Sequence, residues 1–377
     1  MGRHMRAAMV TAGACLVTGL AHAQIVVGVV LSLSGPAAPV GRVQQAVVAH
    51  LPARIGDETV RYMVRDDASD PARAVVVATE VLDAGADLIL GTTSVAASRA
   101  LVPLVAARGV PLISPAALPL REVGTGAPGH WAFRTAPDDW LMAAAIVAHL
   151  RDHGHRRVGF LGFDDSYGAH WATVFGALAD VRGLDVVSQH RFHPGGDDLG
   201  AAVARILAAH PEAVMVAAAG SAAVDVVAAL RGAGFSGPIY QTQAVAVAAF
   251  IDACAGRCDQ VFVPASPARV VMQLPADSPL REAGMAYRDQ LGARAGPFGA
   301  ALWDAGRLFA QAAATALTRA RPGEAAFRVA LRDGLEQVRA LAGANGVYSM
   351  SAGDHVGLDQ RAGWMVRIVD GRWQRAD

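Results

Sequence analysis

Three glycines at dinucleotide-binding spacing are the most suggestive chemical feature of the sequence. Gly124, Gly126 and Gly129 form the G-x-G-x-x-G pattern, in which a tight turn brings backbone N–H groups against a pyrophosphate. That chemistry requires a buried strand before the glycines and a helix after them. Residues 120–123 are instead typical of the end of a helical turn, and Pro128 would break a helix starting in the motif. We interpret the stretch as a loop and expect no nucleotide or other cofactor.

Pairs of potential metal ligands also occur. They are Asp66 with Asp67, His153 with His155, and His190 with His193. No third ligand lies near either histidine pair in the sequence. The two carboxylates stand at the end of a strand, where such groups commonly hydrogen-bond the adjoining loops. We expect structural carboxylates and solvated histidines rather than a metal centre.

Catalytic signatures are missing from the sequence. It has no G-x-S-x-G nucleophile elbow, no Walker loop and no H-E-x-x-H metalloprotease motif. A catalytic triad can still assemble from residues far apart in a chain. On the motifs alone, the protein is predicted not to be an enzyme.

Cys254 and Cys258 are close enough in sequence for a short local disulfide in an oxidising compartment. A zinc site would need further ligands at zinc-like spacing, and none lies beside the pair. Two free thiols remain the other alternative.

The N-terminal residues 1–23 have the organisation of an export signal. Arg3 and Arg6 precede an apolar run at 7–20, and a small-x-small cleavage pattern ends at Ala23. The run is shorter than the roughly 20 apolar residues that span a bilayer. We predict cleavage after Ala23 and a periplasmic protein that does not span the membrane. Cys15 raises the alternative of a lipoprotein, but the large aliphatic residue expected before it is absent.

The amino-acid composition limits the classes of molecule that the protein is expected to bind. Thirty-three basic residues balance thirty-three acidic ones, which removes the electrostatic argument for binding nucleic acid or an anionic membrane. Hydrophobic residues make up 53% of the chain and charged residues 18%, as in a core-rich globular protein. A chain of this length exceeds what one core usually serves, so two lobes are expected.

Hydrophobic periodicity predicts how these residues are positioned. Strand-like runs alternate with helix-like stretches at 25–31, 41–54, 60–65, 72–84, 87–90, 96–108 and 110–114. After an irregular stretch at 115–137 the alternation restarts with 139–153, 158–161, 168–182, 184–190, 197–209, 213–217 and 221–233. Continuous apolar strands are typical of parallel sheets covered by helices on both faces. Two further helices follow at 278–293 and 298–319, and Asp370-Gly371 predicts a tight hairpin turn after 364–369.

A series of short phrases along the chain carries a family resemblance. They lie at 33–36, 66–71, 91 with 110–116, 133–135, 165–168, 296–298 and 303–305. Each is weak alone, but their order resembles the type I periplasmic solute-binding proteins of ABC importers, in the leucine/isoleucine/valine-binding branch. The resemblance implies an α/β fold of two Rossmann-like lobes with parallel sheets, joined by a hinge of three crossovers.

The same resemblance implies a small-molecule ligand held in a cleft between the lobes, hinge closure, and permease and ATPase subunits as partners. We place lobe 1 at 24–137 plus 267–345 and lobe 2 at 138–266 plus 346–377. A ligand-sensing or scaffolding module without a transport role is the alternative function.

Cleft positions transferred from the family depart from those of amino-acid binders. In the family, a residue of the loop after Gly91 offers a hydroxyl to the ligand carboxylate; this sequence has Val95 at that position, with Ser94 adjacent. After Ser114-Pro115 the family has a small residue and then a threonine; this sequence has Ala116 and then Leu118. Tyr167 matches the cleft tyrosine of lobe 2, whereas an expected aromatic residue is replaced by the stretch around Gly220.

The position of the acidic residue that pairs with the ligand ammonium is occupied by Gln243. A buried ammonium without a carboxylate would cost several kcal/mol of desolvation. Helix N-termini near 94–96 and 116–118 could hold a carboxylate or carbonyl group. We therefore expect a ligand without a positive nitrogen, such as an apolar or aromatic carboxylate, an amide or another weakly polar molecule, and an amino-acid-like ligand is the remaining alternative. Apolar contacts would come from Val95, Leu118, Trp140, Tyr167 and Phe298; alternatively, these belong to the core and the cleft residues lie one or two positions away.

Overall fold

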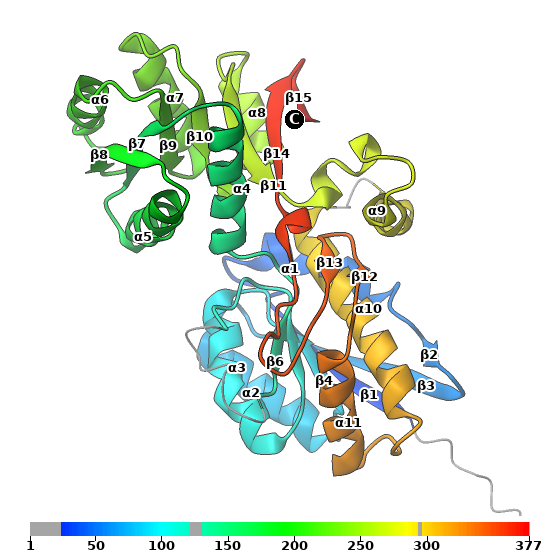
Figure 1. Ribbon diagram of the computed structural model, residues 1–377. Coiled ribbons are helices and arrows are strands. Elements are labelled where there is room, and N and C mark those ends of the chain that lie inside the picture. The colour runs from blue at the N-terminus through cyan, green and yellow to red at the C-terminus, as the bar shows by residue number, and fades with distance from the viewer. Residues whose placement is uncertain (1–23, 121–129, 293–295, 377) are drawn as a thin grey trace, which may run out of the picture.

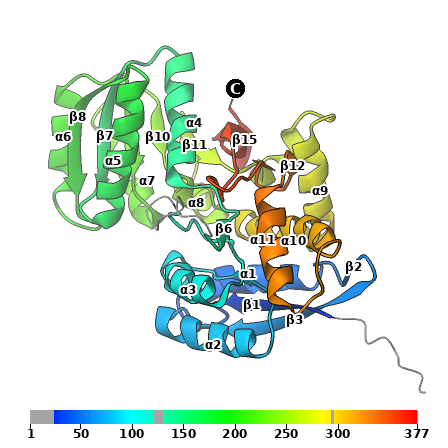
Figure 2. The ribbon, with the colours of Figure 1, turned by 60° about the horizontal axis from the view of Figure 1, so that its bottom comes forward.

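The computed structural model describes residues 24–120, 130–292 and 296–376, which form two α/β lobes (Figure 1). The glycine-rich motif at 124–129 and the predicted signal peptide at 1–23 lie outside these residues. Each lobe combines segments far apart in sequence, since the blue and cyan N-terminal segments share a lobe with orange ones (Figure 2). The predicted two-lobed α/β fold is confirmed.

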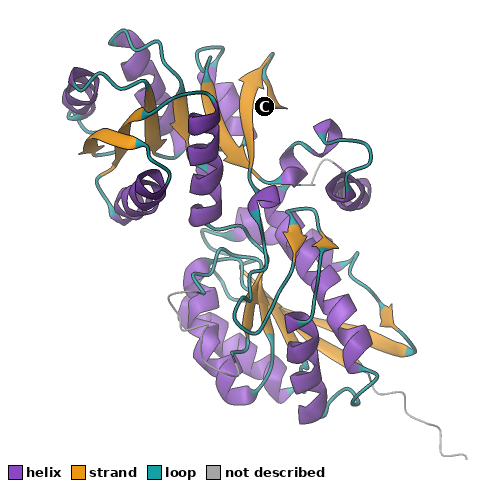
Figure 3. Ribbon diagram, in the orientation of Figure 1, coloured by secondary structure: helices purple, strands orange, loops and turns teal. Residues whose placement is uncertain are grey.

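Lobe 1 is built on a six-stranded sheet in the order β2-β3-β1-β4-β5-β6. Its strands are β1 (Ile25–Leu31), β2 (Arg54–Ile55), β3 (Glu58–Asp66), β4 (Leu88–Gly91), β5 (Leu112–Ser114) and β6 (Ala132–Arg134). All neighbouring pairs except β2 with β3 are parallel. Every residue of β1 is buried because helices cover both faces of the sheet (Figure 3).

The helices of lobe 1 form two layers. They are α1 (Ala38–Val48), α2 (Pro71–Asp83), α3 (Val95–Arg108), α10 (Pro297–Ala316) and α11 (Ala325–Glu336). Alternate residues of β1 pack on the two sides: Val27 and Val29 join the core under α10 and α11, and Val26 and Val30 join the core under α2 and α3. Asp70 begins α2 by accepting the amide N–H of Ala72 at 2.9 Å.

Lobe 2 has a seven-stranded sheet in the order β15-β14-β11-β10-β9-β7-β8. Its strands are β7 (Arg157–Phe163), β8 (Asp185–Phe192), β9 (Ala213–Ala217), β10 (Ile239–Gln241), β11 (Val261–Ala265), β14 (Trp364–Val369) and β15 (Arg372–Arg375). The first five strands are parallel, and β14 and β15 add an antiparallel hairpin. Its turn is Asp370-Gly371, as predicted, and both residues have positive φ.

The helices of lobe 2 are α4 (Asp139–Asp152), α5 (Ser166–Val181), α6 (Leu199–Ala208), α7 (Gly220–Gly232) and α8 (Ala248–Cys254). A disulfide joins Cys254 at the end of α8 to Cys258, which confirms the predicted bridge. It closes the turn that leads into β11.

Three crossovers connect the lobes. The first runs from β6 to α4, and the second runs from β11 to α10 through η2 (Pro267–Arg269), η3 (Val271–Gln273) and α9 (Pro279–Leu291). The third follows the small hairpin of β12 (Leu341–Ala342) and β13 (Val347–Tyr348) and leads through η5 (Gln360–Ala362) to β14. The chain therefore passes between the lobes three times (Figure 1).

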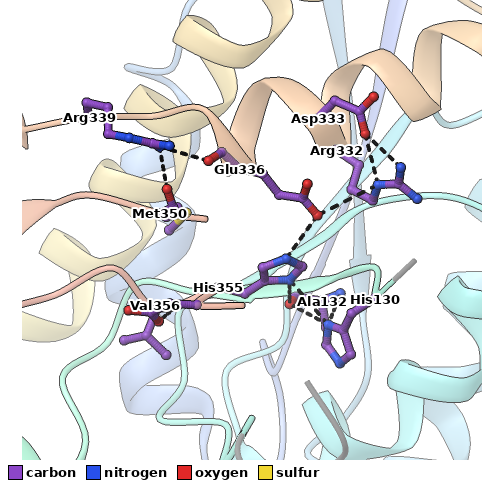
Figure 4. A network of polar contacts seen from close by, with 10 residues as sticks. His130, Ala132, Arg332, Asp333, Glu336, Arg339, Met350, His355 and Val356 are labelled. Carbon is purple, nitrogen blue, oxygen red and sulfur yellow. Dashed lines mark hydrogen bonds and ion pairs between the residues drawn. The ribbon is translucent and has the colours of Figure 1, made fainter. Parts of the chain in front are cut away.

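The third crossover remains attached to lobe 1 over part of its length (Figure 4). The buried ring of His355 stacks on Phe133, with centroids 3.9 Å apart, and its Nε2 lies 3.2 Å from the Glu336 carboxylate. The backbone N–H of Met350 donates to the carbonyl of Val338 at 3.0 Å. Residues around 350–355 thus pack on lobe 1, although the sequence placed them in lobe 2, because a buried histidine gives no periodic signal.

Candidate ligand-binding cleft

A cavity of about 390 Å³ lies between the lobes. Lobe 1 contributes Val95, Ala116 and Phe298 to its wall, and lobe 2 contributes Tyr167 and Gln243. Most of the remaining wall is apolar. The volume falls in the range of small-molecule sites, and the composition is typical of them.

Parallel strands bring the wall residues together. Residues that line the cavity follow the carboxyl ends of several strands: Thr93 after β4, Pro115 after β5, Ala136 after β6, Gln243 after β10 and Ser266 after β11. This is the edge at which open α/β sheets bind ligands, because the loops there are free of the sheet ladder.

Large apolar side chains are exposed on the cavity wall. Val95 is 40% exposed, Phe298 51% and Val247 36%, although each contributes to the wall. Burial of these side chains against an apolar ligand removes them from water and favours binding.

The structure brings together five of the nine predicted cleft residues, which comprise seven positions transferred from the family and the apolar contacts Trp140 and Phe298. The wall contains Val95, Ala116, Tyr167, Gln243 and Phe298. The other four, Ser94, Leu118, Trp140 and Gly220, are not part of the cavity wall.

Two of those four have structural roles in lobe 1. Ser94 is the N-cap of α3, where its Oγ accepts the N–H of Ala97 at 3.2 Å. Leu118 is fully buried in the core beside α2 and α3. No helix begins at 116–118, so the predicted helix N-terminus there was wrong. Pro119 disfavours helical backbone at Leu118, whose carbonyl accepts a hydrogen bond from Arg134 at 2.6 Å.

The other two lie on the surface of lobe 2. Trp140, in the first turn of α4, is 42% exposed and is not part of the wall. Gly220 begins α7 with φ +61°, and a Cβ placed there would meet no atom within 4 Å. Gly220 was transferred from the family and Trp140 was chosen as an apolar contact, and neither prediction used burial.

Gln243 is held by a carboxylate that the sequence analysis missed. Its Nε2 donates to Asp139 Oδ1 at 2.5 Å, and His170 Nε2 lies 3.1 Å from the other oxygen of Asp139. Burial raises the pKa of Asp139, while the bonds from Gln243 and His170 oppose that rise. The amide oxygen of Gln243 is buried and has no hydrogen-bond partner in the described part of the protein. Gln243 therefore offers the cavity an acceptor, not a charge.

Tyr167 is positioned by Thr242, which precedes Gln243. The two hydroxyls lie 2.7 Å apart, and Thr242 is fully buried. Burial raises the pKa of Tyr167 well above its ordinary value, so the phenol stays neutral and presents an aromatic surface.

Asp304 of α10 ties the hinge to the cleft. Its buried carboxylate accepts the backbone N–H groups of Ala344 at 2.7 Å and Asn345 at 2.8 Å, and Asn345 lines the cavity. The hydroxyl of Tyr348 lies 2.9 Å from Asp304 Oδ2 and 2.8 Å from the carbonyl oxygen of Thr135 in the first crossover. Burial raises the pKa of Asp304 to about 6. Helix α10, the first crossover and the β12–β13 hairpin that precedes the third crossover thus meet around one carboxyl group.

The strand-end carboxylates have the structural role that was expected. Asp66 Oδ1 accepts the backbone N–H groups of Leu33 and Ala68, each at 2.8 Å, and Asp67 Oδ1 accepts that of Ser69 at 2.8 Å. Across residues 24–120, 130–292 and 296–376 no three His, Cys, Asp or Glu side chains are grouped to hold a metal ion. The same residues include no helix with the length and apolarity needed to cross a bilayer.

The wall of the cavity also contains polar residues that sequence reasoning missed. They include Gln44, Thr93, Ser266, Arg269 and Asn345. Ser266 and Arg269 lie in the second crossover, where no motif or periodic pattern identified them. Thr93 follows Gly91 in the family-like phrase and donates to Gln44 at 2.7 Å, so spacing could have found it.

Comparisons with known proteins agree with this geometry. Residues 24–372 match a family model described as periplasmic binding protein. The Leu/Ile/Val-binding protein BraC3 of Rhizobium johnstonii is 27% identical over 194 residues, 50% of this chain and 52% of that protein. The chemotactic signal transduction system substrate-binding protein BasB of Halobacterium salinarum is 29% identical over 238 residues, 59% of this chain and 57% of that protein. The chain thus matches little more than half the length of these curated relatives.

A solved structure extends the similarity to nearly the whole chain. An extracellular ligand-binding receptor from Rhodopseudomonas palustris HaA2 superposes with a TM-score of 0.77 at 33% identity. The superposition covers 94% of this chain and 100% of that one. The chain therefore belongs to the type I periplasmic binding protein family, in the branch of the Leu/Ile/Val-binding proteins.

Proposed function

We propose that this protein is the periplasmic substrate-binding component of an ABC importer and captures a small, partly apolar ligand by hinge closure. The observation that carries the proposal is the cavity of about 390 Å³ whose wall is shared by both lobes and the second crossover. Export through the signal sequence at 1–23, with cleavage after Ala23, is part of the proposal.

Closure follows from the division of the wall. Phe298 and Val95 project from lobe 1, and Tyr167 and Gln243 from lobe 2, so a ligand that touches all four holds the lobes together. Such a ligand binds the closed arrangement more tightly than the open one and shifts the population toward it. An importer's permease then recognises the closed, loaded form.

The ligand class follows from the polar groups. Gln243 presents a neutral acceptor, and the carboxylate behind it already contacts Gln243 and His170. A zwitterionic amino acid would need a carboxylate on the wall itself to neutralise its ammonium. We therefore propose a ligand whose head group lacks a positive nitrogen, in contrast to the amino acids named for the Leu/Ile/Val-binding relatives.

A sensing role is the second candidate. The observation that favours it is the similarity to BasB, which is named as part of a chemotactic signalling system. A sensor would use the same closure but present the closed form to a receptor instead of a permease.

Thermal melting of the mature protein, residues 24–377, tests ligand capture. A panel of aliphatic and aromatic carboxylates, their amides and the branched-chain amino acids would be added separately. A ligand at one hundred times its Kd stabilises by about 2.7 kcal/mol. At least one acid or amide should raise Tm, and no shift with any member of the panel would reject the proposal.

A transport assay separates the two roles. The ligand-loaded protein would be added to proteoliposomes that contain the permease and ATPase encoded nearest its gene. Stimulated ATP hydrolysis supports import. Binding without stimulation, together with retention of a chemoreceptor on the loaded protein, supports sensing.

A further inference from the structure

Arg269 lies in the wall of the cavity and is the only residue of that wall, among those the structure describes, with a formal charge. It ends η2 in the second crossover, half-buried between the lobes. The other polar wall residues are amides and hydroxyls. The charge of the cleft is therefore set by one guanidinium group.

Among the residues that the structure describes, the guanidinium of Arg269 has no hydrogen-bond or ion-pair partner. Within the described ranges its side chain makes no ion pair or hydrogen bond, and its buried Nε is unsatisfied. Arg134, the last residue of β6 before the first crossover, shows the usual arrangement: it donates to the Asp138 carboxylate at 2.9 Å and to the Leu118 carbonyl at 2.6 Å. Buried charges are normally paired, since desolvation of an unpaired one is costly. Burial accordingly lowers the pKa of Arg269.

Ser266 places a second unpaired group beside Arg269. The N–H of Arg269 donates to the carbonyl of Ser266 at 2.9 Å, which closes the single 3₁₀ turn between them. Side chains at i and i+3 of a 3₁₀ turn lie over one another. The hydroxyl of Ser266 is buried, lines the cavity and has no hydrogen-bond partner in the described chain. The turn therefore directs a hydroxyl and a guanidinium toward the same part of the wall.

We propose that Arg269, with Ser266, forms the carboxylate-binding subsite of the cleft, and that the ligand is a monocarboxylate with an apolar body. Guanidinium pairs with a carboxylate through two parallel N–H···O bonds, and a hydroxyl can donate to the same oxygens. Such a ligand neutralises the single charge of the wall and places its body against Val95 and Phe298. This inference rests on the proposed capture of a small ligand and specifies which chemical class is captured.

The position of Arg269 separates anion binding from closure. It lies on a crossover rather than inside either lobe, so its charge stays at the hinge as the lobes approach. An anion bound there adds the same contact to both lobe arrangements, while the apolar body supplies the contacts that differ between them.

Isothermal titration of the mature protein with matched acid and amide pairs tests the subsite. The probes are benzoate with benzamide, phenylacetate with phenylacetamide, and hexanoate with hexanamide, at pH 7 where the acids are anions. The expected result is that the best acid binds at least tenfold more tightly than its amide. Arg269→Met should weaken that acid about ten- to a hundredfold and leave the amide within about twofold. The affinity of Arg269→Lys for the acid should lie between those of the unaltered protein and Arg269→Met, because lysine keeps the positive charge but cannot donate two parallel N–H bonds to a carboxylate.

Arg182→Met is the matched control, because Arg182 is an exposed arginine at the end of α5. It should bind the acid as the unaltered protein does. If Arg269→Met does not fold, the carboxylate subsite is tested by the acid and amide affinities of Ser266→Ala and of the unaltered protein.

The outcomes separate this inference from the proposed function. An amide or L-leucine that binds as tightly as the acids, or an acid preference that survives Arg269→Met, overturns the carboxylate subsite and leaves ligand capture intact. If no probe, acid, amide or amino acid, binds the unaltered protein, ligand capture itself is rejected and the subsite with it.

Discussion

The side-chain amide of Gln243 is bonded to the carboxylate of Asp139 over 2.5 Å, from Nε2 to Oδ1. This bond decides what the cleft presents, because it uses the amide's donor and leaves its oxygen for a ligand. It also places a negative charge directly behind the wall, where His170 approaches it at 3.1 Å. The acidic group of Asp139 therefore contacts Gln243, which occupies the position that pairs with the ligand ammonium in the family, but Asp139 is not itself part of the cavity wall.

Replacing Asp139 tests whether its charge takes part in binding. In Asp139→Asn the side-chain oxygen can still accept from Gln243, so the amide should keep its orientation. We expect carboxylate probes to bind equally well or a few-fold more tightly, because a nearby negative charge is removed. Isothermal titration with phenylacetate and hexanoate measures the change. Asp180→Asn, on the exposed side of α5, is the control. Loss of binding in Asp139→Asn alone would show that the ligand needs this carboxylate.

Converting Gln243 to glutamate should redirect the cleft. Gln243→Glu places a second carboxyl group against Asp139, which raises the pKa of the pair and puts negative charge on the wall. Monocarboxylates should bind at least tenfold more weakly, and L-leucine should gain a measurable Tm shift. The paired melting curves of both proteins with hexanoate and L-leucine provide the comparison. Unchanged preference would mean that position 243 does not contact the head group.

The disulfide should stabilise lobe 2 without affecting the ligand. The Cys254–Cys258 bridge closes a very short loop, and loop-closure entropy assigns to it roughly 2 kcal/mol of unfolding free energy. Urea denaturation of the Cys254→Ser, Cys258→Ser double variant should show that loss, with unchanged affinity for the best acid. A reductant should destabilise the unaltered protein and leave the double variant as it was. An affinity change above about threefold would connect this bridge to the cleft.

Stability should fall with rising pH through the range in which Asp304 titrates. Its pKa is raised from 3.8 to about 6 by burial, so the folded state holds the proton more tightly than the unfolded chain. The contribution is fully present below about pH 4 and is lost as pH rises through about 6, by up to roughly 3 kcal/mol. The difference in unfolding free energy between the unaltered protein and Asp304→Asn, measured from pH 4 to 7, isolates this group. A difference that is flat or increases with pH contradicts a neutral Asp304 in the fold.

Those strands, helices and turns that depend on nearby residues alone could be predicted from the sequence. The uniformly apolar run Ile25–Leu31 is a fully buried strand, and the helix-like stretch 72–84 is the helix Pro71–Asp83, since the periodicity of burial needs only nearby residues. The hairpin at Asp370-Gly371 was predictable for the same reason. The three-residue strands Ala132–Arg134 and Ile239–Gln241 show no period and were missed, whereas the equally short Leu112–Ser114 lies within the longer apolar run 110–114 and was predicted.

The cleft was harder to predict, because its residues meet only after the lobes assemble. Tyr167 could be placed because it follows a strand within a family-like phrase, and Gln243 because it aligns with an acidic position of the family. Leu118 was placed by spacing from the family and Trp140 by its apolar character, and neither criterion shows whether a side chain faces the cavity, the core or the solvent. Arg269 gave no signal, since one arginine in an irregular crossover resembles any exposed arginine until its lack of a partner is seen in space.

Mass spectrometry of the small molecule released when the purified mature protein is denatured tests the central claim most directly. The account predicts a monocarboxylic acid with an apolar body and no basic nitrogen, retained by the unaltered protein and by Arg182→Met but not by Arg269→Met. Release of an α-amino acid, retained equally by all three proteins, would contradict it.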